Sequence, residues 1–215
     1  MKNIKAMFGC LTVLAMISTG CTVTTSRSTN AGSPTPATKA TTSGSPTAAK
    51  TLPASKIVPA PANWITMADD RKGYSFEVPE GTGHSIEHSN GIDVFIASTP
   101  APTAVGVMVM AFKDPSLSKA DLVKVATGGL EGLGAKNVKI GELTELSDDY
   151  SLGAYTALNS EGKPVRGKVL VATDVTDNYV MVIGSEEPEY KANEKVIDEI
   201  WGSFSMQSGG SSGKN

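Results

Sequence analysis

The chain has 215 residues, which is enough for one domain with appendages, and only 6% of its residues are aromatic. The formal net charge of −3 conceals an uneven distribution, because all 22 acidic residues lie between 69 and 199, where 12 basic residues leave a local charge of −10. A domain this acidic would repel the phosphates of nucleic acid, and two cysteines exclude both a disulfide-rich scaffold and a zinc site built from cysteines.

The N-terminus predicts an export signal. Lys2 and Lys5 precede a mostly apolar run over 6–17. This run is shorter than the roughly 20 residues of a membrane-spanning helix, but it has the length of the apolar core of a signal peptide. We therefore assign 1–20 to a signal peptide.

The end of this segment resembles the lipobox of bacterial lipoproteins, since Ser18, Thr19 and Gly20 lead to Cys21. Ser18 stands where lipoproteins prefer leucine. The resemblance implies that the Cys21 thiol is acylated with diacylglycerol and that Cys21 becomes the mature N-terminus. The alternative is an ordinary secretory signal that leaves Cys21 as a free thiol. Two or three acyl chains, such as palmitate, would anchor the protein stably to a membrane.

This anchor sets the expected location in the bacterial cell envelope, outside the cytoplasm. Thr22 follows the acylated cysteine, at a place where lipoproteins kept at the inner membrane commonly carry aspartate. In a host with two membranes we therefore expect the periplasmic side of the outer membrane. Otherwise we expect the outer face of the cell membrane.

The next segment predicts a disordered tether. Between 22 and 62, 32 of 41 residues are Ser, Thr, Pro, Ala or Gly, and none is acidic. Such a segment cannot bury enough apolar surface to offset the entropy lost on ordering. We therefore assign 21–62 to a lipidated cysteine and its tether, 63–206 to a globular domain, and 207–215 to a disordered Gly/Ser tail.

Within 63–206 the hydrophobic periodicity predicts strands, then a helix, more strands and a closing helix. Asn90-Gly91 is a strong hairpin signal, and Ser118 with Asp121 forms a capping box that begins the first helix. That helix ends at Gly132 or Gly134. The closing helix begins near Pro188. The predicted strands cover 73–79, 84–87, 92–98, 104–112, 138–146, 151–159, 165–173 and 179–185.

Short hairpin connections make the predicted sheet antiparallel, with about six to eight strands covered by two main helices, and the fold class is therefore α+β. The closing helix should bury one apolar stripe, formed by Val196, Ile197, Ile200, Trp201 and Phe204.

Two short motifs resemble the Mog/PsbP-like superfamily. One is Gly73-Tyr74-Ser75-Phe76 followed by Val78-Pro79 and Gly81, and the other is Trp201-Gly202-Ser203-Phe204. The superfamily includes photosystem II PsbP subunits and the DcrB-type and LpqN-type bacterial lipoproteins. The resemblance implies an α/β/α sandwich and mostly non-enzymatic accessory roles, and it supplies no catalytic residue.

We expect no metal site, because the two histidines do not pair. His84 and His88 are four residues apart, which on a strand is about 13 Å, too far to share one ion unless the hairpin bends. A Ser-His-Asp triad would need one of these histidines, and no Gly-x-Ser-x-Gly motif is present. The sequence therefore predicts no catalytic residue.

Other patterns are weaker still, and we expect no cofactor. The glycine run over 129–134 closes a helix, whereas a phosphate loop opens one. The acidic turns at 148–149 and 174–178 do not fit a spaced Ca²⁺ loop, and weak Ca²⁺ binding there stays an alternative. Trp64 and Trp201 could line a ligand cleft, although Trp201 falls on the core stripe.

The functional hypothesis from the sequence is a membrane-anchored extracytoplasmic lipoprotein with a non-enzymatic binding or accessory domain. Its partners would be the membrane, through acylated Cys21, and a protein of the envelope. The first alternative is a small-ligand-binding lipoprotein that uses a cleft between sheet and helix. The second is a hydrolase with an unrecognised site.

Replacing the proposed acyl acceptor tests the anchor. Cys21→Ser should block lipidation and signal processing together, because the thiol is the group that carries the diacylglycerol. Metabolic labelling with a fatty acid and mass measurement should show a larger, unacylated precursor. Normal labelling of the variant would sink the lipoprotein hypothesis.

Overall fold

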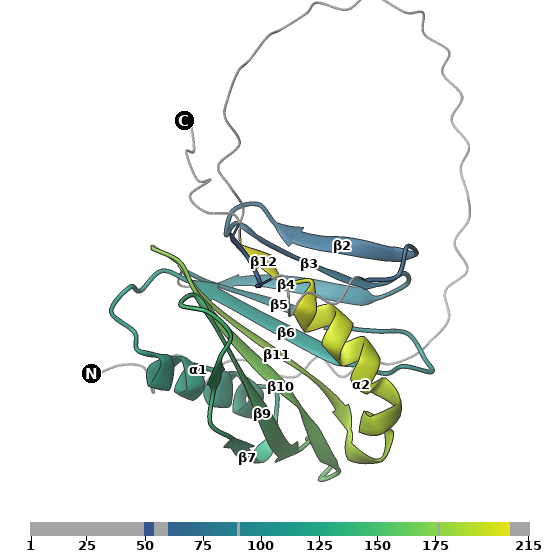
Figure 1. The fold of residues 1–215 in the computed structure, drawn as a ribbon. Coiled ribbons are helices and arrows are strands. Elements are labelled where there is room, and N and C mark those ends of the chain that lie inside the picture. The colour runs from purple at the N-terminus through teal and green to yellow at the C-terminus, as the bar shows by residue number, and fades with distance from the viewer. Residues whose placement is uncertain (1–49, 54–59, 90, 176, 207–215) are drawn as a thin grey trace, which may run out of the picture.

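The computed structural model describes residues 50–53, 60–89, 91–175 and 177–206. The signal peptide, Cys21, most of the tether, Asn90 and the tail over 207–215 lie outside the described residues. Figure 1 shows a large sheet between two helices, α1 (Lys119–Gly132) and α2 (Glu187–Gly202). A smaller sheet shares the α2 side with that helix. Neither helix of this described part has the length and apolar composition needed to cross a bilayer.

The large sheet has eight strands, all paired antiparallel, and its order is β4-β5-β6-β11-β10-β9-β7, with β8 also paired to β9. This confirms the predicted α+β fold with two covering helices. The strands are β4 (Gly83–Ser89), β5 (Ile92–Ser98), β6 (Gly106–Phe112), β7 (Lys136–Ile140), β8 (Thr144–Glu145), β9 (Tyr150–Leu158), β10 (Pro164–Thr173) and β11 (Asn178–Glu186).

The sheet separates two hydrophobic cores, as the central strand β6 shows. Val107 and Val109 face the core beneath α2, whereas Met108 and Met110 face the core beneath α1. Residues 107–112 of β6 are all buried, so this strand is covered on both faces. The capping box of α1 is also present, since the Ser118 hydroxyl accepts from the Asp121 backbone N–H.

Helix α1 packs a glycine against two methionines of β6. A Cβ atom on Gly129 would lie 2.8 Å from the terminal methyl groups of both Met108 and Met110. That distance is shorter than carbon atoms tolerate, so a residue with a Cβ atom would require these two flexible methionine side chains to move. The helix therefore accepts a residue of low helix propensity in exchange for close packing.

The smaller sheet was not foreseen as a separate unit. Its order is β1-β12-β3-β2, with β1 (Lys50–Thr51), β12 (Ser205–Met206), β3 (Tyr74–Pro79) and β2 (Trp64–Asp69). Strand β1 pairs with β12, and the Leu52 side chain is only 2% exposed within the core beneath α2. The packed part of the chain therefore begins before the predicted domain start at residue 63. A strand of two residues is too short to show a hydrophobic period, so the sequence gives no sign of this early start.

Helix α2 buries Ile197, Ile200 and Trp201 of the predicted stripe, whereas Val196 is only partly buried and the buried Phe204 follows the helix. The Trp201 residue is 6% exposed, and its Nε1–H donates to Asp198 Oδ1 at 2.8 Å. The indole therefore packs in the core and does not line an open cleft.

Truncation of this indole should destabilise the domain. Trp201→Ala is expected to lower the free energy of unfolding by about 3–5 kcal/mol, since the ring leaves a cavity. Trp64→Ala is the matched control, and it should cost less because Trp64 is only partly buried. Denaturant unfolding followed by far-ultraviolet circular dichroism measures both. If Trp201→Ala is as stable as the parent, the indole ring does not contribute to the core.

The early start of the packed structure has its own test. Leu52→Ala should lower the free energy of unfolding by about 2–5 kcal/mol, because a buried side chain is removed. Val175→Ala is the control, since Val175 is 81% exposed and should change stability by no more than about 0.5 kcal/mol. If both substitutions are neutral in the same unfolding assay, the domain begins after Leu52.

Candidate functional site

Three side chains with ligand chemistry meet at one end of the molecule. Asp69 ends β2, His88 lies near the end of β4, and Asp93 lies near the start of β5. One ligand atom from each lies within 4.8 Å of the other two. We call Asp69, His88 and Asp93 the carboxylate–histidine cluster. It is the one group of three or more potential metal ligands among the residues that the structure describes.

Contacts within the cluster are short. His88 Nδ1 lies 2.8 Å from Asp93 Oδ1. The Arg71 guanidinium contacts the His88 ring, and its Nη2 lies 3.7 Å from Asp93 Oδ2. The Arg71 backbone N–H donates to Asp69 Oδ1 at 3.0 Å. The Arg71 Nε also lies 3.7 Å from Asp69 Oδ1, so the Arg71 guanidinium pairs with both carboxylates.

The two carboxylates are buried, whereas the basic groups are open to solvent. The side chains of Asp69 and Asp93 are 4% and 9% exposed, against 61% for Arg71 and 40% for His88. Asp69 Oδ2 has no hydrogen-bond partner within the described structure, and neither does the Tyr74 hydroxyl. Burial raises the pKa of the Tyr74 hydroxyl, and the charges of Asp69 and Asp93 raise it further. The site therefore has more negative charge than its protein partners compensate.

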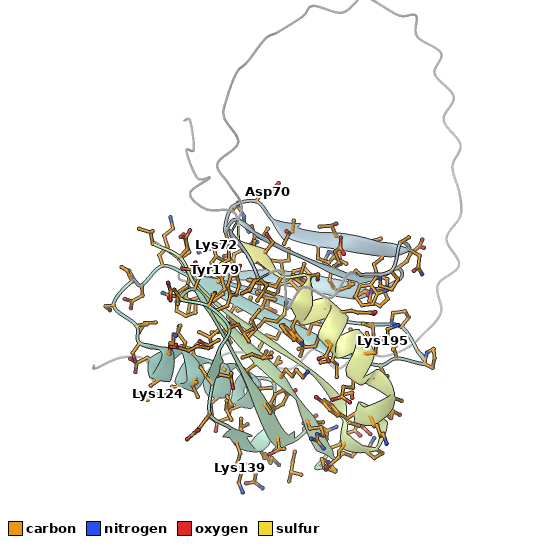
Figure 2. All side chains as sticks on the ribbon, viewed as in Figure 1. Asp70, Lys72, Lys124, Lys139, Tyr179 and Lys195 are labelled. Atoms are coloured by element: carbon orange, nitrogen blue, oxygen red, sulfur yellow. The ribbon has the colours of Figure 1, made fainter. Side chains whose placement is uncertain are left out.

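Two hydrogen bonds hold the segments of this site together. The Tyr179 hydroxyl donates to the Lys72 carbonyl oxygen at 2.6 Å, and Figure 2 shows both residues near Asp70 at the β2–β3 turn. Lys72 Nζ in turn donates to the Gly91 carbonyl oxygen at 2.9 Å. The turn after Asp69 is thereby fixed to β11 and to the β4–β5 hairpin.

The two histidines considered as a pair are not brought together. The His84 ring stacks on Phe95, with ring centroids 5.4 Å apart, and His84 is not part of the cluster. His88 instead meets carboxylates from other strands. One of them has a sequence signal, since the hairpin around Asn90-Gly91 places His88 opposite Asp93 in the β4–β5 register. No sequence pattern relates Asp69 to His88, because Asp69 belongs to β2 of the smaller sheet.

The remaining sequence candidates lie elsewhere. The glycine run over 129–134 includes the end of α1, as expected. In the turn after β10, Asp174 Oδ1 accepts from the Val175 N–H, and Asn178 Nδ2 donates to the Asp114 carbonyl oxygen. The turn at 148–149 lies between β8 and β9. In the described part of the chain, neither turn supplies a member of a three-ligand group.

A second site is an apolar cavity of about 250 Å³ between the end of α1 and the large sheet. Its lining is mostly aliphatic and includes Met108, Leu130, Leu133 and Val182, with Tyr155 as its one aromatic side chain. Leu133 is 42% exposed. The sequence suggested a cleft between sheet and helix but identified none of these lining residues.

Tyr155 crosses the sheet next to this cavity over a row of glycines. A Cβ atom on Gly167 would lie 2.7 Å from the Tyr155 ring, and one on Gly184 would lie 2.5 Å from its hydroxyl oxygen. The added atoms would also lie 2.0 Å from the Ile183 carbonyl oxygen and 2.5 Å from the Arg166 carbonyl oxygen, so neither position accepts a side chain. Burial raises the pKa of Tyr155, so the cavity wall has a neutral hydroxyl that can donate or accept one hydrogen bond.

Comparison with known proteins identifies the fold. No family model matches the chain, and no curated protein matches it. The solution structure of cyanobacterial PsbP (CyanoP) from Synechocystis sp. PCC 6803 is similar, with 16% identity and a TM-score of 0.50. That match covers 68% of this chain and 94% of CyanoP.

Two further solved structures match less well. A Bacteroides thetaiotaomicron VPI-5482 protein shares 11% identity at a TM-score of 0.45, over 69% of this chain and 50% of its own. LpqN of Mycobacterium tuberculosis, which is involved in cell envelope biogenesis, shares 17% sequence identity at a TM-score of 0.36. That match covers 66% of this chain and 86% of LpqN. The likeness to CyanoP confirms the resemblance found in the sequence at the level of fold, and the chain has a PsbP-like fold.

Proposed function

We propose that this protein is a lipid-anchored extracytoplasmic binding protein whose domain holds a small apolar or amphipathic ligand beneath α1. The cavity of about 250 Å³ is the observation that carries this proposal. Such a function agrees with the lipobox at Cys21, which would keep the domain close to lipid. It also agrees with the accessory, non-enzymatic roles that the PsbP-like resemblance implies.

The chemistry of the lining favours binding over catalysis. Tyr155 and Glu186 are the lining residues that can ionise. Tyr155 stays neutral because it is buried, and the Glu186 carboxylate lies 3.3 Å from Lys163 Nζ. A hydrolase needs an acid and a base that face one reacting atom, and these two groups do not supply that pair.

The size of the cavity limits the ligand. Pockets for drug-sized molecules usually have about 300–1,000 Å³, so a volume of about 250 Å³ suits a short acyl chain or a small ring. The Tyr155 hydroxyl can bind one polar group at the end of such a chain. We therefore propose medium-chain fatty acids and alcohols as the ligand class.

The envelope-protein partner expected from the sequence is the second hypothesis, and the described surface gives it less support. Large exposed apolar residues are scattered over four elements, as single residues of β2, β4, the end of α1 and the β10–β11 turn: Ile65, Ile86, Leu133 and Val175. A docking surface would group them into one patch. Crosslinking in intact cells, followed by recovery of the lipidated protein, tests this hypothesis directly.

Ligand binding is tested with a soluble form that begins at Thr22. Displacement of anilinonaphthalene sulfonate by fatty acids of increasing length should show affinity rising about fourfold for each added methylene group, until the cavity is full. Gly106→Leu should abolish displacement, because Gly106 lines the cavity and a side chain there would fill it.

Gly83→Leu is the matched control for this substitution. A Cβ atom on Gly83 has no neighbour within 4 Å, and this glycine does not line the cavity. The Gly83→Leu variant should therefore bind the fatty acids as the parent does. Equal binding by Gly106→Leu and the parent would contradict the cavity as the binding site.

A further inference from the structure

We propose that Asp69, His88 and Asp93 bind one divalent transition-metal ion, and that Zn²⁺ is the ion that this ligand set favours. The site is separate from the cavity beneath α1 and does not depend on the function proposed for that cavity. The inference rests on three ligand atoms within 4.8 Å of one another and on a buried oxygen without a partner.

The first argument is the charge balance at the site. Two carboxylates are more than nine-tenths buried, and Arg71, which pairs with both, is 61% exposed. Placing two like charges this close together inside a protein is costly unless a cation compensates them. The partially solvated guanidinium compensates them in part, and a divalent cation would do so fully.

The second argument is the unpartnered oxygen. The Asp69 carboxylate accepts the Arg71 backbone N–H through Oδ1, but Oδ2 is buried and has no hydrogen-bond partner among the described residues. Leaving a buried acceptor unsatisfied costs about 1–3 kcal/mol, and more when the group is charged. A metal ion bound to Oδ2 would remove this cost. The Tyr74 hydroxyl, which is also unpartnered, lies in the electrostatic field of both carboxylates.

The donor types identify the ion. Mg²⁺ and Ca²⁺ prefer oxygen ligands alone, whereas Zn²⁺ is bound by imidazole nitrogen and carboxylate oxygen together. With metal–ligand bonds of about 2.0–2.2 Å, two ligands of one tetrahedral Zn²⁺ ion lie about 3.3–3.6 Å apart. The present spacing of up to 4.8 Å therefore requires the ligand atoms to close by about 1 Å. His88 is 40% exposed and can make that movement.

Arg71 competes for the same ligands. Its guanidinium contacts the His88 ring and lies close to Asp93, so it covers the face on which an ion would bind. Because this side chain is 61% exposed, it can swing into solvent at little cost. The bound ion would then connect β2 of the smaller sheet to the β4–β5 hairpin of the large sheet.

Zn²⁺ titration of the full chain, purified in detergent without a histidine tag and treated with EDTA, tests the site. Calorimetry should show one ion bound per chain, and the thermal midpoint should rise by about 5–10 °C when Zn²⁺ exceeds its Kd a hundredfold. His88→Gln should weaken binding at least about tenfold and remove the rise. His84→Gln is the matched control, because His84 lies on the same strand outside the cluster, and it should bind as the parent does.

Two further variants keep the test decisive if one of them folds poorly. Asp69→Asn keeps Oδ1 for the Arg71 N–H but loses the charge, so Zn²⁺ binding should fall as it does in His88→Gln. Arg71→Gln should strengthen Zn²⁺ binding several-fold, because a competing positive charge is removed. No Zn²⁺ binding by the parent, equal binding by His88→Gln, or weaker binding by Arg71→Gln would each overturn the proposal.

Discussion

The packing of Tyr74 against Phe204 holds the two ends of the domain together, and most of the structure depends on it. The two rings stack at a centroid distance of 6.0 Å, and Tyr150 and Tyr179 contact Phe204 edge-on. Such pairs contribute about 0.5–1.5 kcal/mol each beyond the area they bury. Because Tyr74 begins β3 and Phe204 follows α2, their contact fixes the smaller sheet and the closing helix on the large sheet.

This contact also explains the two motifs by which the sequence resembled the PsbP-like superfamily. The Glu77 backbone N–H donates to the Ser203 hydroxyl oxygen at 2.8 Å, and Ser75 pairs with Ser205. The motifs are far apart in the sequence but touch in the fold. A contact of this kind serves packing, so the two motifs are informative about the fold and carry no information about chemistry.

The sequence predicted the large elements because their burial has a clear period. Strand β6 alternates between two cores, and α1 begins at a capping box whose hydrogen bonds are present. It missed β1, β12 and the burial of Leu52, because two-residue strands gain their stability from partners distant in the chain. It also missed β2, in which only Met67 and Asp69 are buried, so the strand has little apolar alternation. The cluster was missed with β2. A hairpin register relates His88 to Asp93, but Asp69 joins them only through the smaller sheet.

Tyr74 connects the packing to the polar cluster. Its ring is held by Phe204 and Tyr179, so its hydroxyl has little freedom to turn away from the carboxylates of Asp69 and Asp93. Burying an unpartnered hydroxyl beside two charges lowers stability, and natural folds concentrate such costs at functional sites.

The apolar cavity lies at the other end of β5 from the carboxylate–histidine cluster. Asp93 and Ala97, which lines the cavity, are four residues apart, or about 13 Å along the strand. The two proposed sites therefore occupy separate regions of the molecule. The packing of Tyr74 against Phe204 constrains the carboxylate–histidine cluster far more directly than it constrains the cavity beneath α1.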